Sequence, residues 1–141
     1  MARARTPRFF KNGDGRFPIT FEPDRHPLGR GARVHLDRRC SRVYRIDSKG
    51  RVRQQEYARP TRRATVTYAE LMPACPGRVL PTRVQMLEWD VTAQAVVGIA
   101  DIEDTYERDQ HVWLPMSHRA AVGRGEDRRD IRVELSRPVA L

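Results

Sequence analysis

The sequence predicts an all-β protein, a small sandwich or partly open barrel of about seven or eight short antiparallel strands. Three observations favour this class. Segments rich in β-branched residues alternate with polar residues, turn signals recur roughly every 8 to 15 residues, and helical spacing occurs in only one contested segment. The 141 residues are most simply one β-rich domain at 28–141, preceded by a basic, aromatic-containing arm at 1–27.

The clearest local pattern is a β-hairpin at 41–57, closed by the turn from Asp47 to Gly50. Asp at the first turn position accepts backbone N–H bonds, and Gly at the fourth adopts the left-handed conformation that rejoins the strands. The strand alternation then sets the register. Uninterrupted pairing places Ile46 opposite Val52, Asp47 opposite Arg51, Arg45 opposite Arg53, Tyr44 opposite Gln54, and Arg42 opposite Glu56.

This register predicts a basic face on the hairpin. Arg45, Arg51 and Arg53 share one face, and Asp47 is their only counter-charge in the hairpin. Like charges opposite one another are unfavourable unless water or an anion separates them, so the face is expected to be solvated or bound to phosphates. The predicted nucleic-acid-binding residues are Arg38, Arg39, Arg45, Arg51, Arg53, Arg62 and Arg63.

The arm at 1–27 contains four phenylalanines among its basic residues. Phe17 to Phe21 has the pattern of a short edge strand, because Pro18 cannot donate to a ladder. Apolar rings in a soluble chain most often pack inward. We therefore expect the aromatic side chains to anchor the arm in the core, namely Phe9, Phe10, Phe17 and Phe21.

Further strands follow from alternation and β-branched content. A change of phase at Met86 and Leu87 indicates a β-bulge within the predicted strand at 79–91. Trp113 is expected in the core. The predicted strands cover residues 32–36, 64–72, 79–91, 111–116 and 131–135.

Residues 91–108 admit two interpretations. Apolar side chains recur there at helical spacing after Asp90, a possible cap, so a helix would make the fold α+β. A hairpin turning at Ala93 and Gln94 is favoured, because Val96 to Ile99 is β-branched with a central glycine that a helix tolerates poorly.

The formal net charge of +9 is unevenly distributed. Residues 1–83 carry +13, residues 84–109 carry −6 and residues 110–141 carry +2. Such a basic region favours nucleic-acid phosphates or an acidic protein surface as partner. The acidic segment is expected to pair with the basic part, either inside the fold or across an oligomer interface through 88–109.

The two cysteines, Cys40 and Cys75, form no Cys-x-x-Cys pair, so two reduced thiols are favoured over a disulfide or a zinc site. We expect no metal and no cofactor. No apolar run reaches membrane-spanning length and the first residues lack a signal-peptide pattern, so the predicted location is the cytoplasm or the inside of a virus particle.

Catalytic signals are weak. A magnesium-dependent nuclease site needs convergent carboxylates. The only stretch that resembles one contains Asp101, Glu103 and Asp104, followed by His111. Each of the four histidines, His26, His35, His111 and His118, also qualifies as a general base for metal-independent cleavage of RNA. Adjacent acidic residues are more commonly a solvated edge, and no established catalytic or nucleotide-binding fingerprint occurs.

Three functions are therefore compatible with the sequence. The favoured one is a non-catalytic module that contacts nucleic-acid phosphates through the arginine-rich hairpin. The alternative is a structural or inhibitory interaction component of an assembly, such as a phage particle or a mobile element. The third is a small nuclease that uses Asp101, Glu103 or His111.

Overall fold

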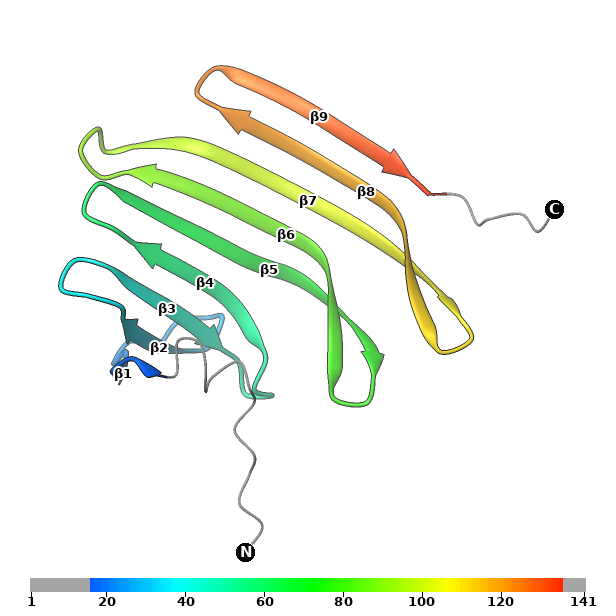
Figure 1. Cartoon of the computed structure of the whole chain (residues 1–141), viewed down its shortest axis with the longest axis horizontal. Helices are drawn as coiled ribbons and strands as arrows, with labels where there is room; N and C mark the ends of the chain where they lie inside the picture. The colour runs from blue at the N-terminus through cyan, green and yellow to red at the C-terminus, as the bar shows by residue number, and fades with distance from the viewer. Residues whose placement is uncertain (1–15, 136–141) are drawn as a thin grey trace, which may run out of the picture.

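The computed structural model describes residues 16–135, which form one open, nine-stranded antiparallel sheet (Figure 1). Each strand pairs with the next strand in the chain, so β1 and β9 are the two edges. The strands are β1 (Ile19–Phe21), β2 (Arg30–His35), β3 (Ser41–Ile46), β4 (Val52–Ala58), β5 (Arg62–Cys75), β6 (Arg78–Asp90), β7 (Ala95–Asp109), β8 (Val112–Arg124) and β9 (Asp127–Glu134).

The all-β class is confirmed, but the predicted sandwich or barrel of seven or eight strands is wrong. The sheet has nine strands and neither closes on itself nor forms a second layer within the described residues. Alternation in a sequence identifies strands and the faces they present. It does not specify whether another layer from the same chain covers the apolar side.

The hairpin β3–β4 has the predicted turn. The Gly50 N–H donates to Asp47 O at 3.0 Å, and Gly50 has a φ of 74°. The register is as predicted at Ile46 and Val52 and beside the turn, where the Asp47 N–H donates to Arg51 O at 2.9 Å, but a bulge after Arg45 moves the remaining pairs by one residue. Arg45 therefore lies opposite Gln54 rather than Arg53. The bulge removes the direct arginine–arginine opposition that uninterrupted pairing would impose.

Residues 91–108 are not helical. Val91 to Gln94 form the turn between β6 and β7, where the Asp90 carboxylate accepts a bond from the Ala93 N–H at 2.8 Å and Gln94 has a φ of 50°. The favoured hairpin is therefore confirmed, and the α+β alternative is wrong. The helical spacing of apolar residues in this segment arises from a long strand whose two faces both carry apolar side chains.

The hairpins β5–β6 and β7–β8 are long and bend, so that in Figure 1 their far ends turn away from the rest of the sheet. Register shifts mark the bends, between Tyr68 and Leu71 in β5 and between Thr105 and Tyr106 in β7. The bulge predicted at Met86 and Leu87 occurs instead at Glu88 and Trp89. A bulge bends the bulged strand and increases its twist.

The other predicted strands are present, and most are longer than the sequence indicated. β2 and β9 correspond to the predictions at 32–36 and 131–135, whereas β8 extends eight residues beyond the predicted end at 116. Trp113 in β8 is only half-buried, and its indole N–H donates to Ala74 O at 2.7 Å. This bond ties the bent end of β8 to the end of β5.

The predicted edge strand near the N-terminus is confirmed as β1, which pairs with β2. Phe21, expected in the core, is 63% exposed, and the Arg30 guanidinium stacks on its ring at 4.6 Å. Phe9 and Phe10 lie outside the described residues. The ring of Phe21 therefore lies on the surface against a basic side chain.

The described part of the chain has very little core. Its buried apolar residues are Val34, Val43, Tyr44 and Ala120. A protein interior normally stabilises the fold by removing apolar side chains from water. Because so few side chains of this sheet are buried, the isolated chain gains little stabilisation from removing apolar side chains from water. Between residues 16 and 135 no helix has the length and apolarity needed to cross a membrane.

Candidate functional site

The predicted basic face is not a single free patch. Arg45 is 9% exposed and donates to the Asp24 carboxylate at 2.8 Å. This hydrogen bond raises the pKa of Arg45 and lowers the pKa of Asp24. Asp24 precedes β2 and lies on the same side of the sheet as Arg45, and no local pattern in the sequence indicates this counter-ion. Arg45 is therefore part of an intramolecular ion pair.

The other two hairpin arginines also have partners within the chain. The Arg51 guanidinium pairs with Asp47 at 2.8 Å. The hydrogen bond from the Arg51 backbone N–H lowers the pKa of Asp47 most, and the hydrogen bond from the Arg51 side chain lowers it further. Arg53 donates to Tyr68 O at 3.3 Å and to Ala69 O at 3.1 Å, at the bulge in β5. These contacts occupy guanidinium N–H donors that were predicted to bind phosphates.

The remaining predicted arginines lie toward the other end of the sheet. Arg38 and Arg39 are exposed in the loop between β2 and β3, and Arg63 is exposed at the start of β5. Arg63 pairs with Ala58 on β4, and Ala58 is about 16 Å along that strand from Arg53 at ~3.3 Å per residue. The seven predicted residues therefore form two separate groups.

Arg62 contributes to pairing between the basic and acidic regions of the chain. Its guanidinium lies 3.7 Å from Glu88 and 3.5 Å from Asp90 on β6. Arg83 forms a two-point contact with Asp101, at 3.1 and 2.8 Å, which lowers the pKa of Asp101. The expected pairing of the acidic segment with the basic part is thus observed inside the fold.

The candidate nuclease residues do not converge. Asp101 is held by Arg83, and Glu103 lies two residues further along β7 on the same face. His111 is exposed in the turn between β7 and β8, about 26 Å along the strand from Asp101 at ~3.3 Å per residue. No group of metal-ligating side chains occurs in the described part of the chain. A shared catalytic centre for these three residues has no support in this arrangement.

Sequence reasoning missed one polar pair. His118 Nδ1 lies 2.6 Å from the Asp104 carboxylate, because Asp104 and His118 are cross-strand partners in β7 and β8. The two residues are 14 apart in the sequence, and only the register brings them together. This pair can be found from the sequence only if the register of β7 against β8 is predicted correctly.

The sheet has one predominantly apolar face. Cross-strand partners share a face, so the register assigns side chains across all nine strands. We call this surface the apolar face. Its apolar members include Val34, Tyr44, Val66, Val84, Met86, Ala100, Ile102, Ala120, Val122, Ile131 and Val133.

Much of the apolar face is in contact with solvent. Met86, Val122 and Ile131, on three different strands, are 42%, 38% and 47% exposed. These side chains lie in the middle and at the β9 side of the sheet, away from the buried residues of β2 and β3. Exposed apolar side chains gathered on one face of a soluble protein are typical of an interaction site.

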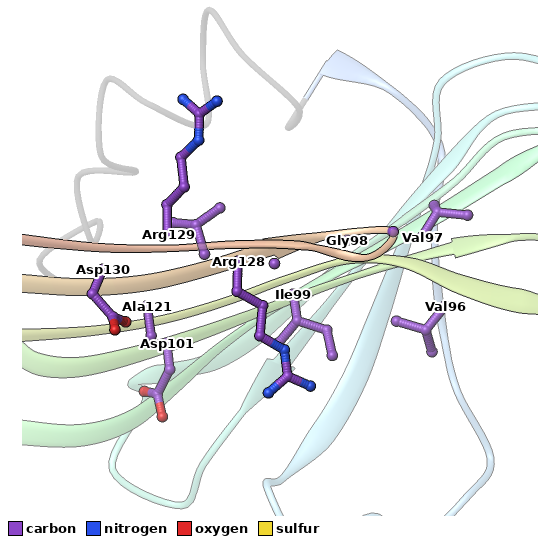
Figure 2. Close-up of a pocket in the computed structure, with 12 residues that line it drawn as sticks. Val96, Val97, Gly98, Ile99, Asp101, Ala121, Arg128, Arg129 and Asp130 are labelled. Carbon is purple, nitrogen blue, oxygen red and sulfur yellow. The ribbon is translucent and has the colours of Figure 1, made fainter.

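The opposite face is rich in charged side chains, and we call it the charged face. It carries Arg83, Asp101, Glu103 and Arg119 on neighbouring strands. A hollow of about 430 Å³ lies on this face near the turn between β8 and β9, between Asp101, Arg128 and Asp130 (Figure 2). It exists because Ala121 and Gly123 have little or no side chain to fill it.

No protein-family model, curated protein or solved structure matches this chain.

Proposed function

We propose that this protein is a non-catalytic structural or inhibitory interaction component, which completes its fold by placing the apolar face of its sheet against other subunits of an assembly. The observation that carries this proposal is the apolar face, which is exposed in the middle of the sheet and toward β9. Covering apolar surface is the dominant favourable term in most protein association, at about 25 cal/mol per Å².

The geometry favours this proposal over the sequence-based nucleic-acid hypothesis. Arg45, Arg51 and Arg53 have partners inside the chain, so they supply fewer donors to phosphates than the sequence predicted. The exposed apolar side chains have no such intramolecular role. Their number and arrangement call for another protein surface rather than for a polyanion.

Two neighbouring residues of β8 provide a matched test. Val122 points to the apolar face and Ala121 to the charged face, and both are exposed. We expect Val122→Lys to shift the purified protein toward monomers in sedimentation velocity and to raise the binding of an apolar fluorescent dye, because disassembly uncovers the rest of the apolar face. Ala121→Lys adds the same charge to the other face and should change neither property.

A wild-type protein that remains monomeric and binds no dye would contradict the proposal. Equal effects of Val122→Lys and Ala121→Lys would also contradict it, because the effect would then follow from charge alone. Far-ultraviolet circular dichroism of all three proteins shows whether the sheet is retained.

Nucleic-acid binding is the second candidate, and a smaller arginine group favours it. Arg38, Arg39 and Arg63 are exposed, and Arg59 lies beside Cys40 in the adjacent loop. Each phosphate contact contributes about one unit to the slope of log affinity against log salt. We expect Arg38→Ala, Arg39→Ala and Arg63→Ala combined to lower this slope for a DNA or RNA duplex, while Arg128→Ala leaves it unchanged. Undetectable binding to either duplex at low salt would exclude this candidate.

A further inference from the structure

The edge formed by β9 is long, and no other described segment of the chain pairs with it. β9 has eight residues, all of them exposed, and it pairs with β8 without a register shift. The other edge, β1, has three residues and lies between Pro18 and Pro23. Proline and short length protect an edge against pairing with another chain, and β9 has neither protection.

The backbone of β9 offers hydrogen-bonding groups at this edge. The Leu135 N–H donates to Met116 O at 2.8 Å, which places residue 135 in a hydrogen-bonded pair with β8. Such pairs alternate along an antiparallel ladder, so the odd-numbered residues of β9 bond to β8. The even-numbered residues therefore direct their N–H and C=O groups outward, namely Arg128, Asp130, Arg132 and Glu134.

The side chains of these outward-bonding residues alternate in charge along the charged face. Figure 2 shows Arg128 and Asp130 on the same side as Asp101, whereas Arg129 points to the other side. Arg132 and Glu134 follow on the same side and form an ion pair within the strand. The order along the strand is positive, negative, positive and negative.

We infer that the β9 edge pairs with β9 of a second copy of this chain, antiparallel and about a twofold axis at Ile131. This register places Arg128 opposite Glu134 of the second copy and Asp130 opposite Arg132 of the second copy. By symmetry each pair occurs twice, and Ile131 meets its own copy on the apolar face. The inference rests on the proposed function, since it names one partner of the assembly.

The alternation also disfavours neighbouring registers. Moving the second strand by one step of two residues places Asp130 opposite itself and Arg128 opposite Arg132. The opposite step places Arg132 opposite itself and Asp130 opposite Glu134. Like charges directly opposite are destabilising in a sheet. Larger steps restore opposite charges but pair at most five residues of β9, against seven in the proposed register.

Charge exchange within β9 tests the register. Asp130→Arg places two arginines opposite each other in both symmetric pairs, and we expect the dissociation constant of the dimer to rise about tenfold or more. Arg132→Asp should weaken association in the same way. The double variant Asp130→Arg/Arg132→Asp restores both pairs, so its dimer should regain affinity close to that of the wild type in sedimentation equilibrium.

Cysteine cross-linking tests the axis. In a Cys40→Ser/Cys75→Ser background, Ile131→Cys places two thiols in a non-hydrogen-bonded pair, with Cα atoms about 4.5 Å apart, within the range of a disulfide. We expect mild oxidation to give a covalent dimer. Val133→Cys is the matched control, because Val133 lies opposite Arg129 of the second copy and its own copy is about 13 Å away at ~3.3 Å per residue.

The outcomes separate this inference from the proposed function. No disulfide at Ile131→Cys, or no rescue in the double variant, overturns the β9 pairing. If Val122→Lys still disrupts assembly in that case, the proposed function stands without it. Equal cross-linking of Ile131→Cys and Val133→Cys would also overturn the register, because it would indicate random collision.

Discussion

Arg45 shows how a single residue changed the functional interpretation. In the sequence it belongs to a polar, solvent-facing strand position, and its nearest acidic neighbour along the hairpin is Asp47. In the fold its partner is Asp24, 21 residues earlier in the chain. The carboxylate reaches Arg45 because the segment after β1 crosses the charged face of β3. Local sequence cannot reveal a contact that depends on the path of a loop.

The Asp24–Arg45 pair predicts a pH dependence. The folded-state pKa of Asp24 lies below its ordinary value of 3.8, so the stabilisation is fully present above that value. It is lost as the pH falls through the lowered pKa, because the protonated carboxyl no longer pairs with Arg45. We expect Asp24→Asn to be less stable than the wild type at pH 7, and the difference to shrink as the pH falls toward 2.

Urea unfolding midpoints at several pH values measure this effect. Glu126→Gln, in the exposed turn between β8 and β9, provides the control and should follow the wild type throughout. A difference between Asp24→Asn and the wild type that stays constant down to pH 2 would show that the effect does not come from the carboxylate charge.

At the scale of single elements, the connection before β2 is the most constrained. Gly29 has a φ of 120°, and a side-chain Cβ there would lie 2.1 Å from Ile46 O at the end of β3. Gly77, in the turn between β5 and β6, has a φ of 74° with open space around it. Both glycines have a positive φ, which disfavours other residues, but only Gly29 is packed against backbone.

We predict a large difference between alanine substitutions at these glycines. Gly29→Ala combines backbone strain with a clash and should lower the free energy of unfolding by about 2–4 kcal/mol. Gly77→Ala has the strain alone and should lower it by about 1 kcal/mol. Urea denaturation of both variants measures the two values. Equal losses would mean that the loop before β2 moves away from β3 at little cost.

The elements also show what the sequence could and could not predict. The turn from Asp47 to Gly50 depends on four adjacent residues, and it was predicted correctly. The hairpin turning at Ala93 and Gln94 is predicted correctly, because Gly98 and its β-branched neighbours suit a strand, and β7 is that strand. The bulge after Arg45 was missed, because the alternation within β3 and β4 does not indicate that their pairing shifts by one residue. Strand ends were missed where β8 continues through small residues such as Ala120 and Ala121.

For the whole molecule, the number of layers was the main error. A sandwich and a single sheet share the same alternation along each strand, and they differ only in whether the chain returns over its own apolar face. Between residues 16 and 135 every strand pairs with its successor, and no strand crosses back. The candidate site was missed for the same reason. The apolar side chains assigned to a core are the surface that now carries the proposed function.

Assembly through this surface predicts that thermal stability depends on protein concentration. A partner that binds only the folded state stabilises it by mass action, and a hundredfold increase in a ligand is worth about 2.7 kcal/mol. In a dimer this free energy is divided between two protomers, and each share raises the melting temperature by about 3–6 °C. Differential scanning calorimetry at about 1 and 100 µM measures it. A melting temperature that does not change with concentration would argue against self-assembly.

The order of strands in the sheet repeats their order in the chain. Every pairing partner is thus synthesised immediately before or after its neighbour, and no strand waits for a distant segment. We expect the sheet to grow hairpin by hairpin as the chain leaves the ribosome, beginning near β3 and β4. Hydrogen exchange on ribosome-bound chains that end after β6 would then show protected amides in β3 to β5 before the last three strands exist.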